Sequence, residues 1–335
     1  TCALPASWRC AWYHRHYGLT INPETEIMIT HGGVEAITLS ILCTSDAGDG
    51  VMVSNPSYML YERTIQMLNR VPISLERSIS ISQYSDVLND ELINSLNNKH
   101  KIRMMIVNSP ENPSGYVLSK DDWEAVHKFC NTNDIWLVHD EVYDTMHFTR
   151  DHKPVGTSST LPRNSIIINS FSKKFGIPGL RIGWLIANED FIEQAAKAHD
   201  YMYLGVNSQY EEIARLILEN AEIDIWLIDN SAKIHQRALK MTSVLTEKIG
   251  YTWDRPPYGA MFLFPNVENL YKIIPAEFRK NNLTVGEAVA NYLLEVKKVA
   301  VVPGIVYGRN SANHIRLVLC SSEEVFENAL NQLSS

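Results

Sequence analysis

The 335-residue sequence is poor in cysteine and has no long apolar run. Its five cysteines are odd in number and scattered, without a CxxC pair, which argues against a disulfide framework or a zinc site. Reduced thiols in a cytoplasmic location are therefore expected. The apolar runs are too short to span a bilayer, and the first residues lack the charged start and apolar centre of a signal peptide. No membrane partner is expected.

Positive charge is also scarce. The 30 lysines and arginines are outnumbered by 38 acidic residues, so the formal net charge is -8, and no basic cluster offsets it. This balance argues against a nucleic-acid partner. With 45% hydrophobic and 20% charged residues, the chain has the composition of an ordinary globular protein, and its length favours one large domain plus a smaller one.

Short apolar runs alternate with amphipathic stretches, which is typical of α/β proteins with a mostly parallel central sheet between helices. Buried strands are predicted at 51–54, 104–107, 135–138 and 166–168. Helices are predicted from Ser119, a capping-box residue, to about 130, at 211–220, and from about 223 to 249, with a break near Asp229 as an alternative.

The pattern changes after Gly250, which is expected to end the long helix. Strands at 259–264 and 314–319 and helices at 285–296 and 323–333 predict a smaller α+β domain. We therefore divide the chain into a large α/β domain, residues 1–240, and a small C-terminal domain, residues 241–335.

The most informative segment, SFSKKFGIPGLRIG at 170–183, follows the apolar run 166–168. Its serines and arginine can donate to phosphate oxygens, and its glycines let the backbone approach a ligand closely. A lysine at the end of a buried strand can lose its proton and form an imine. The alternative is that Lys173 and Lys174 are solvated surface charges, which would leave the serines and arginine unexplained.

Other polar residues also follow predicted strands. Asn108 and Asn112 follow the strand predicted at 104–107, and Asp140 and Tyr143 follow the one predicted at 135–138. Ligands of open α/β sheets bind beyond the carboxyl ends of the strands, so these side chains can converge with Lys173 on one crevice. Each has a simpler alternative, such as a turn at Asn112 or a helix cap at Asp140. Together they fit a phosphorylated aromatic cofactor.

On these motifs the chain resembles fold-type I pyridoxal-phosphate enzymes, specifically the class I/II aminotransferases related to aspartate aminotransferase. The resemblance implies pyridoxal 5'-phosphate as cofactor, Lys173 as the catalytic Schiff-base lysine and Lys174 at a variable position. Three side chains match the family's phosphate ligands, and a loop at a predicted helix start matches the one whose backbone amides hold the phosphate. The side-chain ligands are Ser170, Ser172 and Arg181. The loop consists of Gly32, Gly33 and Val34.

The resemblance also assigns the remaining contacts. Asp140 matches the aspartate at the ring nitrogen, and Asn112 and Tyr143 match the ligands of the phenolate oxygen. Tyr58, in Asn-Pro-Ser-Tyr, matches the aromatic residue that stacks on the ring, with a rim tyrosine as the alternative. Arg316, in His-Ile-Arg-Leu, matches the arginine that binds the substrate α-carboxylate beside Asn112, with a surface arginine as the alternative.

The resemblance implies a homodimer that transfers the amino group of an L-amino acid to a 2-oxo acid, by a ping-pong mechanism through pyridoxamine phosphate. A lyase or oxidase on the same scaffold is an alternative. So is a truncated, catalytically impaired homologue, because the chain begins late relative to the family and the N-terminal arm is expected to be missing. A sensor domain of a transcriptional regulator is disfavoured, since no basic winged-helix domain precedes the match.

Three further polar sites are assigned simpler roles. Asn207, at a position where some relatives reach the other subunit's phosphate, is interpreted as a cap of the helix before Glu211. The segment His14-Arg15-His16 is expected to be exposed on an N-terminal helix. His139 is expected to support the site without performing chemistry.

Overall fold

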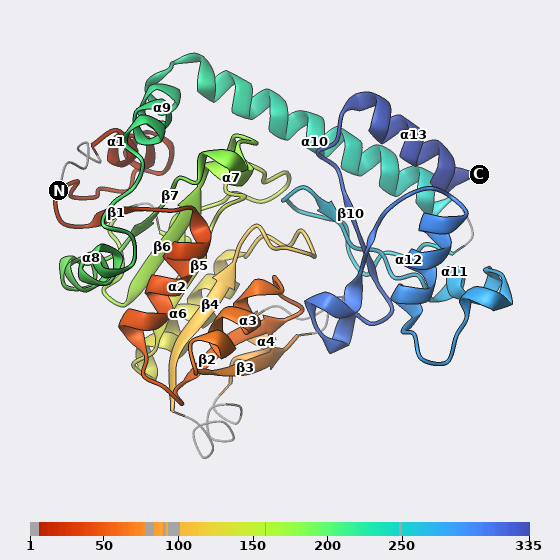
Figure 1. Cartoon of the computed structure of the whole chain (residues 1–335), viewed down its shortest axis with the longest axis horizontal. Helices are drawn as coiled ribbons and strands as arrows, with labels where there is room; N and C mark the ends of the chain where they lie inside the picture. The colour runs from red at the N-terminus through yellow and green to blue at the C-terminus, as the bar shows by residue number, and fades with distance from the viewer. Residues whose placement is uncertain (1–6, 78–83, 90–91, 93–100, 158, 248–249) are drawn as a thin grey trace.

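The computed structural model describes residues 7–77, 84–89, 92, 101–157, 159–247 and 250–335. A seven-stranded sheet and a three-stranded sheet lie in different parts of the molecule (Figure 1). The long helix α10 (Glu222–Thr246) begins beside the larger sheet and extends to the smaller one (Figure 1). The expected boundary at residue 240 falls inside this continuous helix, so the division into two domains stays a prediction.

The larger sheet has the order β1-β7-β6-β5-β4-β2-β3. Within this described sheet, β7 runs antiparallel to both of its neighbours and the other pairs are parallel. The predicted mostly parallel α/β fold is confirmed. The strands are β1 (Ile27–Thr30), β2 (Gly50–Asn55), β3 (Val71–Glu76), β4 (Ile102–Asn108), β5 (Trp136–Asp140), β6 (Ser165–Ser170) and β7 (Gly183–Ile186).

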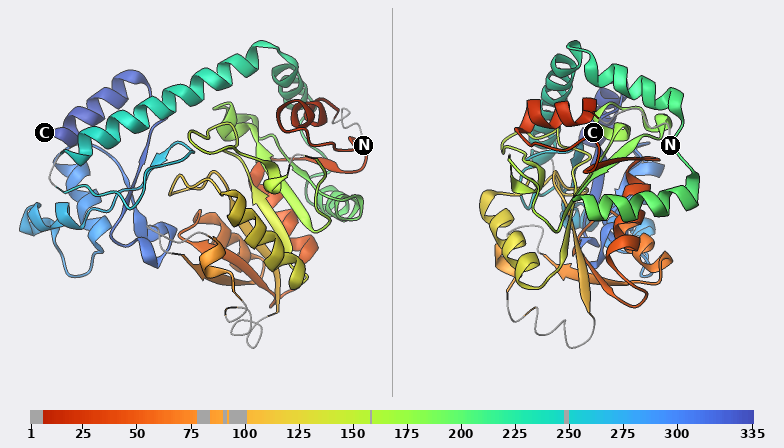
Figure 2. Two further views of the ribbon diagram at one scale, coloured as in Figure 1. Left: turned by 180° about the vertical axis from the view of Figure 1, so that it is seen from behind. Right: turned by 90° about the vertical axis from the view of Figure 1, so that its left-hand side faces the viewer.

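Helices cover both faces of this sheet (Figure 2). One core contains Met104 and Ile106 together with residues of α2 (Gly33–Thr44), α3 (Leu60–Met67) and α8 (Glu189–Tyr203). The other contains Met105 and Val107 together with residues of α1 (Ser7–Tyr17), α4 (Tyr84–Val87) and α6 (Lys120–Thr132). Because successive side chains of a strand point to opposite faces, burial on both faces requires the uninterrupted apolar run that the sequence shows.

The four predicted strands are confirmed as β2, β4, β5 and β6, whereas β1, β3 and β7 are not predicted from the sequence. β1 and β7 have four residues each, and β3 alternates buried Ile73 and Leu75 with exposed Ser74 and Glu76. None of the three gives the long apolar run on which the other predictions depend. The capping box of α6 is confirmed, since the Ser119 hydroxyl accepts from the Asp122 amide.

The smaller sheet is antiparallel, in the order β8-β10-β9, with β8 (Phe262–Leu263), β9 (Val302–Pro303) and β10 (Ile315–Val318). The strand predicted at 259–264 is largely wrong, because Ala260 has φ of 60° and leaves the extended conformation. The predicted helices are confirmed as α12 (Val285–Glu295) and α13 (Glu323–Ser334).

The predicted break in the long helix is also wrong. Asp229 lies on an exposed face of α10, where a charged side chain does not disturb helical hydrogen bonds. Residues 248–249, at the predicted end, lie outside the described residues.

The remaining elements are α7 (Phe171–Lys174), α9 (Ser208–Glu219), α11 (Glu268–Ile273), and the 3-10 turns η1 (Pro154–Gly156), η2 (Pro178–Leu180), η3 (Ala276–Phe278), η4 (Gly304–Tyr307) and η5 (Arg309–Ser311). Among the helices described, none combines the length and the apolar character needed to cross a membrane.

Candidate active site

A cavity of about 180 Å³ lies where β4, β5 and β6 end and α2 begins. Most of the site residues expected from the sequence line it. They are Gly33, Val34, Tyr58, Asn112, Asp140, Tyr143, Ser170, Ser172, Lys173 and Arg181. Gly32 and Arg316 are not among the lining residues, but each contacts one that is. The sheet therefore brings these side chains together at the carboxyl edge of its parallel strands, as the topology predicts.

Close backbone packing shapes one end of the cavity. A Cβ atom on Gly183 would lie 2.6 Å from the carbonyl carbon of Gly32 and 2.8 Å from the amide nitrogen of Gly33. Gly32 has φ of 75°, and a Cβ there would lie 2.7 Å from Nη2 of Arg181. Only glycine lets β7, the start of α2 and this guanidinium approach so closely. The orphan amides of the first turn of α2 lie at this end, which suits it to an anion.

Asp140 is a buried carboxylate at the end of β5. Its Oδ2 accepts a hydrogen bond of 2.5 Å from the Tyr61 hydroxyl, and its Oδ1 accepts a longer one of 3.3 Å from the Val142 amide. Burial raises the pKa of Asp140 to about 6, although both of these hydrogen bonds act to lower it. Burial, together with the nearby Asp140, also raises the pKa of Tyr143, so its hydroxyl is a hydrogen-bond donor at neutral pH.

Arg316 reaches the cavity from β10 of the smaller sheet. Its Nη1 donates to Oδ1 of Asn112 at 2.9 Å, and its guanidinium lies 4.4 Å from the ring centroid of Phe262. Its buried Nε has no hydrogen-bond partner among the residues that the structure describes. This hydrogen bond turns Oδ1 of Asn112 toward Arg316 and its amide nitrogen away, and the unpartnered Nε leaves the arginine able to bind a further acceptor.

The two adjacent lysines have different surroundings. Lys173 is exposed and lines the cavity, whereas Lys174 is fully buried and donates to Oδ2 of Asp144 at 2.8 Å. The position that the resemblance describes as variable in the family thus holds a buried ion pair in this chain. Consecutive residues of a helix point about 100° apart, so one lysine faces the cavity and the other faces the interior.

Lys174 belongs to a buried ionic cluster behind the cavity. The Tyr17 hydroxyl also donates to Asp144, at 2.8 Å. Glu141 accepts hydrogen bonds from the Tyr13 hydroxyl and the Asn169 amide, and lies 3.0 Å from Nε2 of His152. Burial raises the pKa of Glu141 to about 7 and lowers that of His152 to about 4. The buried ionic cluster consists of Tyr13, Tyr17, Glu141, Asp144, His152, Asn169 and Lys174.

His139 lies next to this cluster with its ring engaged on both sides. Its Nδ1 accepts from the Val155 amide at 2.9 Å, and its Nε2 lies 3.0 Å from the carbonyl oxygen of Ser109. His139, Glu141 and His152 are close enough to suggest a metal site. However, an Nδ1 that already accepts a backbone hydrogen bond has no lone pair left for an ion.

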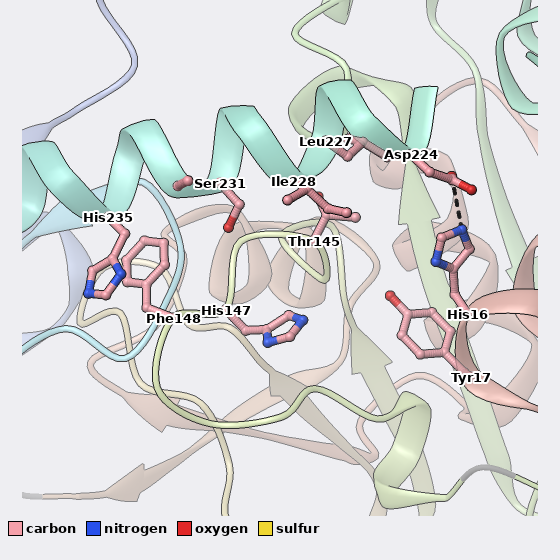
Figure 3. A pocket seen from close by; sticks show the side chains of 11 residues that line it. His16, Tyr17, Thr145, His147, Phe148, Asp224, Leu227, Ile228, Ser231 and His235 are labelled. Carbon is pink, nitrogen blue, oxygen red and sulfur yellow. Dashed lines mark hydrogen bonds and ion pairs between the residues drawn. The ribbon is translucent and has the colours of Figure 1, made fainter. Parts of the chain in front are cut away.

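A second hollow, of about 380 Å³, lies between α1, the 145–148 loop and α10 (Figure 3). His16 lies 3.1 Å from Asp224 across it, and the rings of Phe148 and His235 stack with centroids 4.7 Å apart. None of the site residues expected from the sequence lines this hollow. It is larger than the cavity at the strand ends but lacks an amine beside an anion cradle. The reading of His14-Arg15-His16 as exposed is confirmed.

Two of the simpler sequence interpretations can be compared with the structure. The side chain of Asn207 caps α9 by accepting from the amides of Gln209 and Tyr210, as predicted. Tyr61, in contrast, lines the cavity without having been expected there. Its spacing of three residues from Tyr58 in Tyr-Met-Leu-Tyr could have indicated it, because residues three apart on a helical turn share a face.

The comparisons with known proteins agree with this architecture. The profile of the family described as "Aminotransferase class I and II" matches residues 9–333. The chain is 25% identical over 325 residues to aspartate aminotransferase of Pyrococcus horikoshii, covering 96% of this chain and 78% of that protein. It is 26% identical over 321 residues to transaminase BacF of Bacillus subtilis, covering 94% and 74%.

Among solved structures, an aspartate aminotransferase double mutant of Thermus thermophilus has the same fold. Its TM-score is 0.83 at 23% identity, over 99% of this chain and 81% of that one. The fold is thus that of fold-type I enzymes. The family match over nearly the whole length shows that the chain belongs to the class I and II aminotransferases and is a transaminase.

Proposed function

We propose that the protein is a pyridoxal-phosphate-dependent aminotransferase, which transfers the amino group of an L-amino acid to a 2-oxo acid by a ping-pong mechanism. The observation that carries the proposal is the position of Lys173, buried Asp140 and the glycine-lined anion cradle around one cavity. An amine, a carboxylate and an anion cradle around one cavity suit the aldehyde, the ring nitrogen and the phosphate of this cofactor. When bound, the cofactor supplies an electron-withdrawing ring that stabilises negative charge at the substrate Cα.

The phosphate group would lie in the cradle. The amides of Gly33 and Val34 belong to the first turn of α2, where the helix dipole favours an anion. The hydroxyls of Ser170 and Ser172 and the guanidinium of Arg181 would donate to the remaining oxygens. The tight approach of Gly32 and Gly183 supports this assignment, because it leaves backbone and not side chains against the anion.

The ring would be held from three sides. The ionised Asp140 would accept from the protonated ring nitrogen, and the low polarity of its surroundings would strengthen that bond. Tyr143 and the amide group of Asn112, which Arg316 orients, donate to the phenolate oxygen. Tyr58 presents its ring face to the cofactor ring.

Lys173 and Arg316 would act on the substrate. Lys173 would hold the cofactor aldehyde through its amine, and the same amine would accept and return the Cα proton of the substrate as general base and acid. Arg316 binds the α-carboxylate through nitrogens that include its unpartnered Nε, and so orients the Cα–H bond.

Borohydride reduction of the cofactor-loaded protein, followed by peptide mapping, tests the assignment of Lys173. We expect the label on Lys173, and we expect Lys173→Ala to abolish it while Lys174→Ala retains it. A label on Lys174, or no label with excess cofactor, would contradict the proposal. Amino acid turnover that requires a 2-oxo acid identifies transamination. Turnover without one would identify the lyase or oxidase alternative, and a loaded protein whose spectrum ignores amino acids would identify an impaired homologue.

We also propose that the protein is a cytoplasmic homodimer. Large apolar side chains are exposed at the end of α8 and along α9, including Tyr201 at 93% and Leu204 at 84%. This surface adjoins the cradle, since Nε2 of His31 lies 3.1 Å from the carbonyl oxygen of Gly205. Exposed apolar surface of this kind is typical of protein interfaces. Light scattering should give twice the monomer mass, and Leu204→Asp should reduce it; an unchanged monomer would contradict a dimer.

A further inference from the structure

Tyr61 touches two of the groups that would hold the cofactor ring. It lies in α3 and is 1% exposed. Its hydroxyl donates to Oδ2 of Asp140 at 2.5 Å. Its ring packs edge-to-face against Tyr58, with centroids 5.5 Å apart and an interplanar angle of 87°. One side chain thus connects the ring-stacking tyrosine of one segment to the carboxylate at the end of β5.

These two contacts fix different properties of the site. The edge-to-face contact limits rotation of Tyr58 about its side-chain bonds, which keeps its ring face toward the cavity. The hydrogen bond occupies Oδ2 of Asp140, while Oδ1 accepts only the longer bond from the Val142 amide. Each carboxylate oxygen can accept a second hydrogen bond, and Oδ1, which accepts only the longer bond, is the one less engaged by its protein partner.

We propose that Tyr61 is a positioning residue, which orients Asp140 toward the ring nitrogen of the cofactor and Tyr58 toward its face. The inference rests on the proposed function, because it assumes that this cavity binds pyridoxal phosphate. Tyr61 lines the cavity beside both residues and acts through its contacts with them.

The hydrogen bond also affects the charge of Asp140. Burial and the neighbouring Asp140 raise the pKa of Tyr61, so the hydroxyl keeps its proton and remains the donor. Burial raises the pKa of Asp140 to about 6, and the bond from Tyr61 acts against this rise. Removal of the hydroxyl should therefore raise the pKa of Asp140 further, and the ionised form should be lost at a higher pH. The titratable groups around this carboxylate are Tyr61 from α3, Tyr58 just before α3, Glu141 and Tyr143 after β5, and Lys173 from α7.

The chain offers a matched control for a test. Tyr116 is 2% exposed, and its hydroxyl donates to Oδ2 of Asp122 at 2.6 Å. Neither residue lines the cavity at the strand ends. Tyr61→Phe and Tyr116→Phe thus remove the same hydroxyl from the same kind of buried tyrosine–aspartate pair, one beside the cavity and one away from it.

The experiment measures the affinity of each protein for pyridoxal phosphate by absorbance titration across pH. A hydrogen bond to a charged group corresponds to roughly tenfold or more in affinity, so we expect Tyr61→Phe to bind about tenfold more weakly at neutral pH. The pH at which affinity is half lost on acidification should rise. Tyr116→Phe should match the unmodified protein in both respects. Tyr61→Leu, which also removes the edge-to-face contact, should bind more weakly than Tyr61→Phe and reduce the circular dichroism of the bound cofactor.

A folded Tyr61→Phe protein with unchanged affinity and unchanged pH midpoint would overturn the inference. If Tyr61→Phe does not fold, 3-fluorotyrosine at position 61 tests it instead. The more acidic phenol is a stronger donor, so the pH midpoint should fall, and no shift would overturn the inference. Failure of the proposed function is distinguishable, since the unmodified protein would then fail to bind pyridoxal phosphate or show no borohydride label on Lys173.

Discussion

Lys174→Met tests how the buried ionic cluster supports the fold beneath the cavity. Lys174 and Asp144 are both 0% exposed, with their charged atoms 2.8 Å apart. At an effective dielectric constant of about 20, their attraction is about 6 kcal/mol, which the cost of removing both ions from water largely offsets. Methionine keeps the length of the side chain but leaves Asp144 buried without a cation. We expect the free energy of unfolding to fall by about 3–5 kcal/mol.

Urea denaturation followed by circular dichroism measures this change, and the neighbouring lysine provides a control. Lys173→Met alters an exposed side chain and should change the free energy of unfolding by no more than about 0.5 kcal/mol. Lys174→Met combined with Asp144→Leu should recover most of the loss, because no unpaired charge remains. If Lys174→Met is as stable as Lys173→Met, the buried ion pair does not stabilise the fold.

The pH dependence of the same variant has a definite sign. Burial acts to raise the pKa of Asp144, but Lys174, together with His152 and the Tyr17 hydroxyl, outweighs burial and the pKa is lowered. The ion pair therefore stabilises the protein above the unfolded pKa of about 4, and this stabilisation disappears as pH falls through the folded pKa. The difference between Lys174→Met and the unmodified protein should be largest near neutral pH and shrink in acid.

Three further predictions concern other parts of the site. Gly183→Ala should weaken binding of pyridoxal phosphate at least tenfold in an absorbance titration, because its Cβ would lie 2.6 Å from the carbonyl carbon of Gly32. Gly179→Ala is the control and should not weaken binding, because a Cβ at Gly179 has no atom within 4 Å. Arg316→Lys should raise KM for amino acids about 10- to 100-fold in steady-state assays, since a point charge replaces a bidentate donor; an unchanged KM would remove Arg316 from the substrate site. Burial lowers the pKa of His152 to about 4, so the unfolded state binds its proton between about pH 4 and 6.5 and stability rises with pH there. His152→Asn should reduce that slope by about 1.4 kcal/mol per pH unit in urea denaturation, and an unaltered slope would show that His152 does not titrate this way.

The strands of the central sheet could be predicted where burial on both faces requires an uninterrupted apolar run in the sequence. β4 and β6 are apolar at successive positions, because each residue enters one of two cores. β1 and β7 are too short for this signal, and their pairing depends on contacts between residues far apart, such as Ile27 with Ile186. In the smaller sheet the prediction failed for a local reason. The composition of 259–264 suggests a strand of six residues, but the positive φ of Ala260 shortens it.

The residues around the cavity could be predicted because several parallel strands end at the same edge of the sheet. Side chains that follow β4, β5 and β6 reach the same edge of the sheet, so sequence position after a strand predicts location. Tyr61 and Lys174 could not be assigned in this way. Their roles depend on partners distant in the sequence, Asp140 and Asp144, and local sequence patterns do not reveal such pairs.

Two adjacent pairs of residues connect the cavity to the buried ionic cluster. In Asp140-Glu141 and in Lys173-Lys174 the first member lines the cavity and the second lies in the cluster. The side chain of each second member forms hydrogen bonds or an ion pair in the cluster. Because each second member is covalently joined to the first, we expect the cluster to limit movement of the carboxylate and the amine that would meet the cofactor. A cluster substitution that leaves the protein folded, such as Lys174→Met with Asp144→Leu, should therefore lower kcat more than a substitution of equal stability far from the cavity. If both lower kcat equally, the cluster contributes to stability alone.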